Sequence, residues 1–341
     1  MKKNVFRSVL LKMLIGSMTI MGQAGFAQKK GVNVEKSKEI TPAMLTRILE
    51  KNKGFYTEGK VADYIPELSK MNEKAVAFAV VKKNGEVLSV GDTTQKFTIQ
   101  SISKVVSLMV AVQDRGEKEV FSKMGYYGTD KPFNHYANLE TMGKPLNPLM
   151  NAGAILTTSM INGTNDEGFQ KILAMVRYIT KNDQINYSKD VYMSEKETGH
   201  KNRGMFYLMK NNGLISGGEE LLDNYFRQCS IEVTAEDLAK IGYFFANECV
   251  RFDGDTKYKN KEMARLVQSQ MLTAGMYEFS GEYARTVGLP SKSGVGGGIT
   301  VSVPHGIGIG VFSPGLDKQG NSVVGYKMIL DLVQELDLSI F

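Results

Sequence analysis

Two short motifs in this chain contain the residue types of a serine acyl-transfer site that uses a lysine as its base. Ser101 and Lys104 form a Ser-x-x-Lys motif, and Lys292-Ser-Gly294 follows nearly two hundred residues later. Either motif alone is weak, because a Ser-x-x-Lys occurs by chance about once or twice in a chain of this length. Their joint occurrence, in this order, favours Ser101 as a nucleophile and Lys104 as its base.

The pattern around the first motif predicts a helix from about residue 101 to residue 115, which Gly116 ends. Ser101 would lie in the first turn, with Lys104 on the same face one turn later. The positive end of the helix dipole would stabilise negative charge near Ser101. It would also disfavour a protonated Lys104, which helps a lysine to act as a neutral base. The strand edge from Lys292 to Val295 could carry an oxyanion hole.

Strand signals occur towards both ends of the chain. Apolar residues 75–81 and 87–90 flank Asn84-Gly85, which is a strong hairpin signal. Gly-rich apolar runs over residues 295–303 and 307–312 predict two adjacent strands near the other end. Between these regions, from about residue 120 to residue 275, apolar residues mostly follow helical spacing.

These signals predict an α+β fold in which both chain ends build one antiparallel sheet and an all-helical subdomain is inserted between them. Thr41-Pro42 starts a helix before the sheet, and residues 326–336 form a closing helix. Residues 41–341 would form a single catalytic domain. Its sheet part would cover about 41–120 and 275–341, and its helical part about 121–274.

The start of the chain resembles a signal peptide. Residues 1–27 have a basic beginning, a mostly apolar middle and small residues, Gly25 and Ala27, before a cleavage point. The protein is therefore expected in the periplasm or outside the cell, with a cytoplasmic location as the alternative. The apolar run is too short to span a membrane, so no membrane span is expected after processing. Residues 28–40 would form a polar lead-in to the domain.

The composition excludes several classes of function. Apolar residues make up 42% of the chain and charged residues 23%, which is typical of a globular protein. The net charge is +6, but four basic residues lie in the acid-free first 27, so residues 28–341 carry only +2. This nearly neutral charge gives no basis for a nucleic-acid partner. The three histidines are scattered and no His/Cys cluster has metal-ligand spacing, so no metal site is predicted.

The chain contains two cysteines, Cys229 and Cys249, which could pair in an exported protein. Both lie in apolar, helix-like sequence, where a cysteine is more often a small buried apolar residue. We therefore favour free thiols at both positions.

Six longer motifs follow one another through most of the chain and include the two described above. Gly-Lys-Val-Ala-Asp-Tyr-Ile-Pro lies at 59–66, Ile-Gln-Ser-Ile-Ser-Lys at 99–104, Gly-Lys-Pro-Leu-Asn-Pro-Leu-Met-Asn-Ala-Gly-Ala-Ile at 143–155, Tyr-Phe-Arg-Gln-Cys-Ser-Ile-Glu at 225–232, Gly-Met-Tyr-Glu-Phe-Ser-Gly at 275–281 and Lys-Ser-Gly-Val-Gly-Gly-Gly-Ile at 292–299. Together they resemble the glutaminase family that is related to the serine β-lactamases and deamidates free L-glutamine. The resemblance implies a β-lactamase/transpeptidase-like fold.

The resemblance also implies roles for individual residues. Ser101 would be the nucleophile and Lys104 its base, with Tyr225 or Tyr277 in the proton relay. The backbone N–H groups of Ser101 and Val295 would hold the oxyanion. The residues expected to contact the substrate are Ser101, Asn151, Glu195, Asn202, Tyr225, Tyr277 and Val295, together with Tyr64 and Gln100 beside the nucleophile.

Two of these expectations rest on physical arguments as well. A free amino acid carries an ammonium and a carboxylate on one carbon, so Glu195 could pair with the first and amide or phenol donors with the second. Glu195 and Asn202 are seven residues apart, so on one helix they would share a face. Without the resemblance, Glu195 would be interpreted as a solvated helix end, and the two tyrosines as core aromatics.

The sequence departs from the family pattern in two places. The family usually has Asp-Arg before the asparagine that corresponds to Asn202, whereas this chain has His200-Lys201 there and Arg203 after it. Leu149 stands in place of the serine of the β-lactamase Ser-x-Asn triplet, so no hydroxyl is expected there.

The resemblance predicts hydrolysis of L-glutamine to L-glutamate and ammonia through a seryl acyl-enzyme, without a metal or an organic cofactor. It also implies a homodimer or a homotetramer. One alternative is a penicillin-recognising serine acyl-transferase or hydrolase, which export would suit. The other is a non-turnover amino-acid sensor that keeps the pocket or is acylated once.

Overall fold

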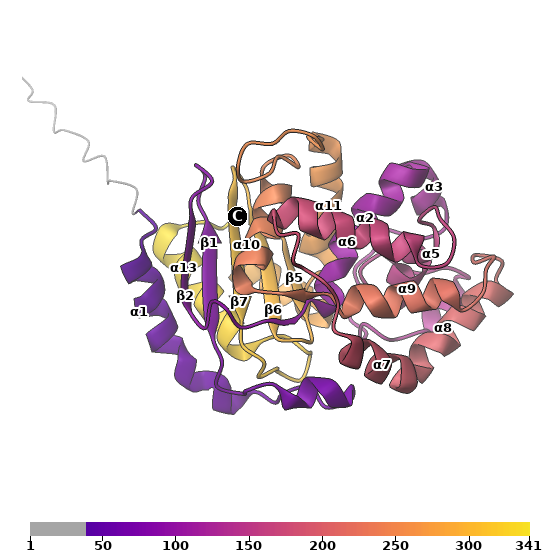
Figure 1. Cartoon of the computed structure of the whole chain (residues 1–341), viewed down its shortest axis with the longest axis horizontal. Coiled ribbons are helices and arrows are strands. Elements are labelled where there is room, and N and C mark those ends of the chain that lie inside the picture. The colour runs from indigo at the N-terminus through magenta and orange to yellow at the C-terminus, as the bar shows by residue number, and fades with distance from the viewer. Residues whose placement is uncertain (1–38) are drawn as a thin grey trace, which may run out of the picture. The chain divides into compact units, whose positions relative to one another are not determined.

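The computed structural model describes residues 39–341 of the chain. The predicted signal peptide over residues 1–27 lies outside the described residues, as does most of the predicted lead-in. Within the described part, an antiparallel sheet carries helices on both faces, and a further group of helices lies beside it (Figure 1).

Strands from both ends of the chain form this five-stranded sheet, as the sequence predicts. β1 (Ala77–Val81) pairs with β2 (Val87–Gly91) on one side and with β7 (Ile307–Phe312) on the other. β6 (Gly298–Val303) pairs with β7 and with β5 (Ser291–Gly294), so the strand order is β2-β1-β7-β6-β5. The hairpin predicted at Asn84-Gly85 is confirmed, and all the neighbouring strands run antiparallel.

The strand predicted over residues 295–303 is wrong at its beginning. β5 ends at Gly294, residues 295–297 form a turn, and β6 begins only at Gly298. The N–H of Gly297 donates to the carbonyl of Gly294 at 2.9 Å, and Gly297 has a φ of +97°. The turn therefore uses a backbone conformation that glycine adopts readily, and it reverses the chain where a continuous apolar run suggested one strand.

The two faces of the sheet bury different kinds of side chain. On β1, Phe78 and Val80 pack with α1 (Pro42–Asn52) and α13 (Val323–Leu336) in one apolar core. The intervening alanines belong to the core on the opposite face, because side chains alternate along a strand. The predicted start of α1 is confirmed, since the Thr41 side chain accepts from the N–H of Met44 at 3.2 Å.

The opposite face of the sheet is covered by α10 (Ala235–Ala246), which begins at a capping box formed by Thr234 and Asp237. By sequence, α10 belongs to the region assigned to the inserted helices, yet it packs directly on β1, β6 and β7. A Cβ atom at Gly310 would lie 2.1 Å from the carbonyl oxygen of Ala235. The glycine in β7 therefore permits backbone contact between this strand and the helix.

We expect Gly310→Ala to lower the free energy of unfolding by about 1–3 kcal/mol, because the new methyl group would meet helix backbone and not a flexible side chain. Urea unfolding followed by circular dichroism measures the change. Gly281→Ala is the matched control, because it is an exposed position in α12 (Ser280–Thr286) with no atom within 4 Å of the added Cβ. The control should raise stability by about 0.5–1 kcal/mol. An unchanged midpoint for Gly310→Ala would contradict the packing described.

The remaining helices form the group beside the sheet or flank its edge. A short second sheet, in which β3 (Phe97–Thr98) pairs with β4 (Glu232–Val233), connects the Ser101 segment to the end of α9. The helices are α2 (Ser103–Arg115), α3 (Glu117–Ser122), α4 (Ala137–Thr141), α5 (Asn151–Ser159), α6 (Glu167–Thr180), α7 (Lys189–Thr198), α8 (His200–Asn211), α9 (Glu220–Cys229) and α11 (Lys261–Ala274), with 3₁₀ turns at Lys53–Glu58, Pro66–Lys70, Gln100–Ile102 and Tyr277–Phe279.

Candidate active site

Ser101 lies in a 3₁₀ turn (Gln100–Ile102) at the entrance to α2. The sequence predicts an α-helix from residue 101, but α2 begins two residues later, at Ser103. Gln100 has a φ of +48°, a left-handed conformation that costs a non-glycine residue about 1–3 kcal/mol. The Ser103 hydroxyl donates to the Gln100 carbonyl at 2.7 Å and helps to hold this turn. The result is a serine that precedes a helix and is only 7% exposed.

Lys104 is fully buried beneath this turn, and its amine makes two hydrogen bonds. Nζ donates to Asn151 Oδ1 at 2.7 Å and to the carbonyl of Leu149 at 3.1 Å. Burial lowers the pKa of Lys104 to about 8, an effect that Cys229 and Glu195 partly oppose. A neutral amine has two N–H donors and one lone pair, so these two acceptors leave the lone pair free to take a proton.

Asn151 connects the amine to the helix α8. Its Nδ2 donates to Asn202 Oδ1 at 3.0 Å, while its Oδ1 accepts from Lys104. The position that lacks the β-lactamase hydroxyl, Leu149, contributes its backbone carbonyl to the same amine. A displacement of Asn151 would therefore disturb both the amine and Asn202.

Tyr277 and Lys292 form a second buried pair, on the β5 side of the site. The amine of Lys292 donates to the carbonyls of Gly275 and Ser293 at 3.1 and 2.6 Å and lies 4.4 Å from the centre of the Tyr277 ring. The Tyr277 hydroxyl also donates to the Ser293 carbonyl, at 3.1 Å. Burial and the nearby Lys104 hold the pKa of Lys292 well below its usual range. Sequence reasoning used Lys292 only as part of a motif and missed this buried amine.

The turn between β5 and β6 packs directly against the segment before Ser101. A Cβ at Gly296 would lie 2.2 Å from the carbonyl oxygen of Thr98, so only glycine fits there. Val295 is the first residue of this turn and is 5% exposed. The Gly-rich run therefore brings the backbone around Val295 close to the Ser101 turn.

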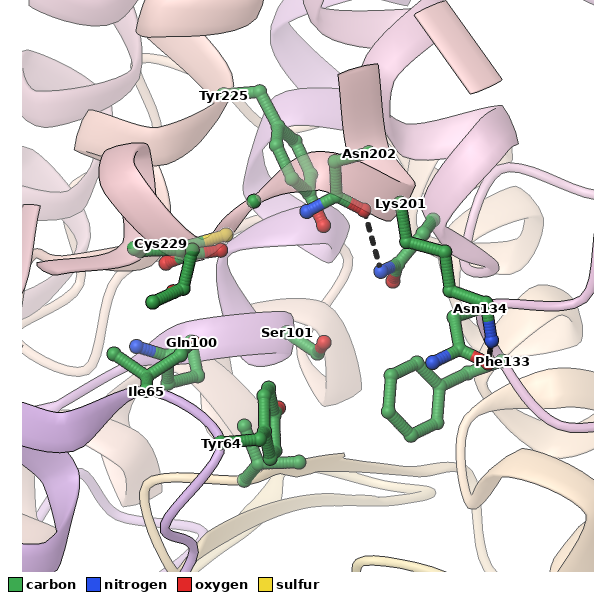
Figure 2. A pocket seen from close by; sticks show the side chains of 15 residues that line it. Tyr64, Ile65, Gln100, Ser101, Phe133, Asn134, Lys201, Asn202, Tyr225 and Cys229 are labelled. Atoms are coloured by element: carbon green, nitrogen blue, oxygen red, sulfur yellow. Dashed lines mark hydrogen bonds between the residues drawn. The ribbon is translucent and has the colours of Figure 1, made fainter. Parts of the chain in front are cut away.

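A cavity of about 260 Å³ opens over Ser101. Figure 2 shows Ser101 in its middle, with Tyr64 and Phe133 on one side and Tyr225 and Asn202 on the opposite side. Lys104 and Tyr277 lie outside its lining. The lining residues are Tyr64, Ile65, Gln100, Ser101, Phe133, Asn134, Asn151, Glu195, Thr198, Gly199, Lys201, Asn202, Tyr225, Cys229 and Val295.

Glu195 and Asn202 both line the cavity, as their seven-residue spacing on a single helix would allow, but they lie on two different helices. Glu195 belongs to α7, which ends at Thr198, and Asn202 belongs to α8, which starts at His200. Between the two helices, a Cβ at Gly199 would lie 2.6 Å from Phe226 Cζ and 2.7 Å from the Glu195 carbonyl oxygen. The chain bends at this glycine and brings both side chains to the cavity from different helices.

Within residues 39–341, one oxygen of the Glu195 carboxylate has no hydrogen-bond partner. Its side chain is 6% exposed, and among the described residues Oε2 has no hydrogen-bond partner. Burial raises the pKa of Glu195 to about 8, while Lys104 has an opposing effect. A buried, unpaired carboxylate oxygen in a cavity is suited to a cationic ligand, because such a ligand would restore the lost hydrogen bond and charge partner.

Several cavity residues were not identified from the sequence. Phe133, Asn134 and Lys201 lie on one side, and the Lys201 amine donates to Asn134 Oδ1 at 3.2 Å. Cys229 also lines the cavity, and burial raises the pKa of its thiol well above the usual range. The prediction that both cysteines are free and buried is confirmed. Spacing alone gave no signal for Asn134, because it lies in a loop outside the six motifs.

Residues 39–341 contain neither a metal-binding cluster nor a helix that could cross a membrane. That part of the chain contains no group of three or more His, Cys, Asp or Glu side chains placed to hold a metal ion. None of its helices combines the length and the apolar character that a membrane crossing needs.

Comparison with known proteins identifies the family. A family model described as Glutaminase matches residues 59–341, which is most of the chain. The chain belongs to the glutaminase family. Its relatives in the family include a glutaminase of Clostridium botulinum (strain Kyoto / Type A2), 49% identical over 303 residues, and glutaminase 2 of Clostridium perfringens (strain 13 / Type A), 46% identical over 301 residues. Each alignment covers 87% of this chain and 99% of the relative.

Solved structures of glutaminases share the fold. A Bacillus subtilis glutaminase complexed with 6-diazo-5-oxo-L-norleucine superimposes with a TM-score of 0.81 at 34% identity, covering 89% of this chain and 98% of that one. A covalent complex of Bacillus subtilis glutaminase YbgJ with 5-oxo-L-norleucine has a TM-score of 0.79 at 33% identity, covering 88% and 99%. The predicted α+β, β-lactamase-like fold is therefore confirmed for this family member.

Proposed function

We propose that this protein hydrolyses L-glutamine to L-glutamate and ammonia through an ester on Ser101. The observation that carries the proposal is that Ser101 and Glu195 line one cavity of about 260 Å³, and that Glu195 has a buried carboxylate oxygen with no partner among residues 39–341. This volume lies below the range of about 300–1,000 Å³ usual for drug-sized ligands, and it suits a small amino acid. The names of the relatives support the same substrate.

In the first step, Lys104 takes the hydroxyl proton of Ser101, whose oxygen then attacks the side-chain amide carbon of glutamine. The negative charge on the amide oxygen would be stabilised by the backbone N–H groups of Ser101 and Val295. The dipole of α2 acts in the same direction, because Ser101 precedes the positive end of this helix.

In the second step, the C–N bond breaks and ammonia leaves with the proton that Lys104 had taken. Tyr277 or Tyr225 would pass this proton to the leaving nitrogen. Water then attacks the glutamyl ester, Lys104 accepts a proton from the water, and the Ser101 oxygen recovers it as glutamate is released. The covalent complex formed by the Bacillus subtilis relative supports a covalent step in this site.

Ammonia release from L-glutamine by the purified protein tests the proposal directly. A chromogenic β-lactam, offered to the same sample, tests the penicillin-recognising alternative. Steady release of ammonia without β-lactam turnover would support the proposal. A single burst with no steady state would favour the sensor, and β-lactam turnover without ammonia would favour the other acyl-transferase.

The activity should increase with pH up to about pH 8. The base Lys104 works only when neutral, and Glu195 binds an ammonium only when ionised, so both groups must have lost a proton. Because both pKa values are about 8, kcat/KM should rise by more than about tenfold per pH unit between about pH 6 and pH 7.5. Initial rates over this range, at low glutamine concentration, measure the slope.

A control assay at pH 8 after incubation at pH 6 separates titration from acid inactivation. Glu195→Gln should weaken L-glutamine binding and make the slope shallower, because only one titration then remains. A flat or decreasing profile of the parent protein between pH 6 and pH 8 would contradict the assigned roles.

A further inference from the structure

A second cavity adjoins the one over Ser101. It has a volume of about 350 Å³ and shares Tyr64, Phe133 and Val295 with the Ser101 cavity. Figure 2 shows Tyr64 and Phe133 on the side of Ser101 that lies away from Asn202. The second cavity therefore continues the site beyond these two aromatic rings.

Two segments that are distant in the sequence form the rest of its lining, residues 60–63 and 316–320. The N–H of Lys60 donates to the Leu316 carbonyl at 2.9 Å, and the N–H of Leu316 donates to the Lys60 carbonyl at 3.0 Å. Leu316 is 8% exposed and belongs to one apolar cluster with Val295, against which Phe133 packs. The cavity thus has an apolar floor next to Val295.

The rim of the second cavity carries two lysines and two acids, and only one of the four has an unused charge. The Lys60 amine donates to the Asp63 carboxylate. The Asp317 carboxylate accepts two backbone N–H groups of its own turn, each at 2.9 Å. Lys318 is exposed and forms no ion pair within residues 39–341. A group that enters this cavity would therefore be favoured if it carried a carboxylate.

The proposed reaction determines which part of a substrate would reach the second cavity. The N–H of Val295 would hold the amide oxygen, and Val295 belongs to both cavities, so the C–N bond that breaks would lie at their border. Glu195, the proposed partner of the substrate ammonium, lines only the Ser101 cavity. A substituent on the amide nitrogen would then extend past Tyr64 and Phe133 into the second cavity.

We propose that the second cavity binds the leaving group of γ-glutamyl dipeptides, so that the protein also hydrolyses the γ-glutamyl bond to a second amino acid. In such a dipeptide, the amide nitrogen carries an amino acid whose carboxylate would pair with Lys318. Its side chain would contact the apolar floor at Leu316. The inference rests on the proposed function and extends its substrates from glutamine to N-substituted γ-amides.

The chemistry needs no group beyond those already described. The Ser101 oxygen forms an ester with the γ-carbonyl carbon, and the C–N bond breaks. The nitrogen of the departing amino acid takes the proton that Lys104 removed from Ser101. Water then hydrolyses the ester, and the products are L-glutamate and the free second amino acid.

Release of L-glutamate from three substrates tests the proposal: L-glutamine, γ-glutamylglycine and γ-glutamylethylamide. The ethylamide has the same substituted amide as γ-glutamylglycine but lacks its carboxylate. The parent protein should hydrolyse all three. Lys318→Met should lower kcat/KM for γ-glutamylglycine by about two- to fivefold, because the ion pair is exposed and screened by solvent. It should leave kcat/KM for the other two substrates unchanged, and Lys318→Arg should keep the parent value for γ-glutamylglycine.

Lys70→Met is the matched control. Lys70 is an exposed lysine that pairs with Glu67 and lines neither cavity, so its loss should leave all three rates as they are in the parent protein. Release of ammonia from L-glutamine without hydrolysis of γ-glutamylglycine would overturn the inference and leave the proposed function intact. An equal effect of Lys318→Met on γ-glutamylglycine and the ethylamide, or no effect on either, would also overturn it. If no substrate releases L-glutamate, the proposed function is wrong and the inference is rejected with it.

Discussion

Ser101→Ala should reduce ammonia release from L-glutamine by at least about a thousandfold, because no oxygen would remain at that position to form the ester. The substitution removes one buried oxygen and leaves Glu195 and α8 in place, so L-glutamate should still bind with nearly the parent affinity. Steady-state ammonia release measures the loss, and calorimetry with L-glutamate measures retained binding.

Ser103→Ala is the matched control, because it removes another buried hydroxyl from the same segment. Its activity should decrease by less than about tenfold, through the lost hydrogen bond to the Gln100 turn. Treatment with 6-diazo-5-oxo-L-norleucine, followed by peptide mass spectrometry, should place the label on the peptide that contains Ser101. Full activity of Ser101→Ala, or a label on Cys229, would require a different nucleophile.

Lys104→Met should lower kcat for L-glutamine by about 10²–10⁴-fold, because methionine fills a similar volume but cannot accept a proton. The increase of kcat/KM through pH 8 should also become shallower, since the titration of Glu195 alone would remain. Rates from pH 6 to pH 9 measure both effects.

The variant loses the donor for Asn151 Oδ1 and the Leu149 carbonyl, so thermal unfolding and L-glutamate binding must accompany the kinetics. A folded Lys104→Met protein that keeps the parent pH slope would reject Lys104 as the base. Lys292→Met provides the comparison with the second buried amine. If only Lys292→Met abolished the titration near pH 8, the role of base would move to Lys292.

Local signals in the sequence were sufficient for much of the fold. Thr41-Pro42 predicted the start of α1, and Asn84-Gly85 predicted the β1–β2 hairpin, because both depend on backbone preferences of a few adjacent residues. The positions of the apolar runs also predicted that strands from both chain ends form one sheet. The Ser-x-x-Lys motif and the resemblance then led to residues that the fold brings to one cavity or directly behind it.

Features that depend on contacts between distant segments were not predictable. The seven-residue spacing of Glu195 and Asn202 fits one helix, and the helix break at Gly199 reflects the proximity of Phe226 from α9. Similarly, α10 has the apolar spacing of any amphipathic helix, and its place on the sheet depends on Gly310 in a distant strand. The positive φ of Gln100 has no local sequence signal either, because it is a strained conformation that surrounding packing imposes.

The site itself was predicted as a set of residue types and not as an arrangement. To predict that the amines of Lys104 and Lys292 are buried, one would need to know which backbone carbonyls surround them in the fold. Lys201 looked like a departure from the family pattern, and only the bend before α8 places it beside the cavity. In these cases tertiary packing, which sequence spacing does not encode, decides the chemistry of the side chain.

The pairing of β1 with β7 has a consequence for biosynthesis. These strands are more than two hundred residues apart, and Ser101 and Val295 are nearly two hundred apart, so a ribosome completes the first of each pair long before the second. Until β7 emerges, the inner edge of β1 lacks its neighbour and the nascent polypeptide exposes an unpaired strand. Any translation product that stops before residue 291 would lack both the central strands and the turn opposite Ser101. The cavity over Ser101 would therefore be completed only late in synthesis, when the three carboxyl-terminal strands add to the free edge of β1.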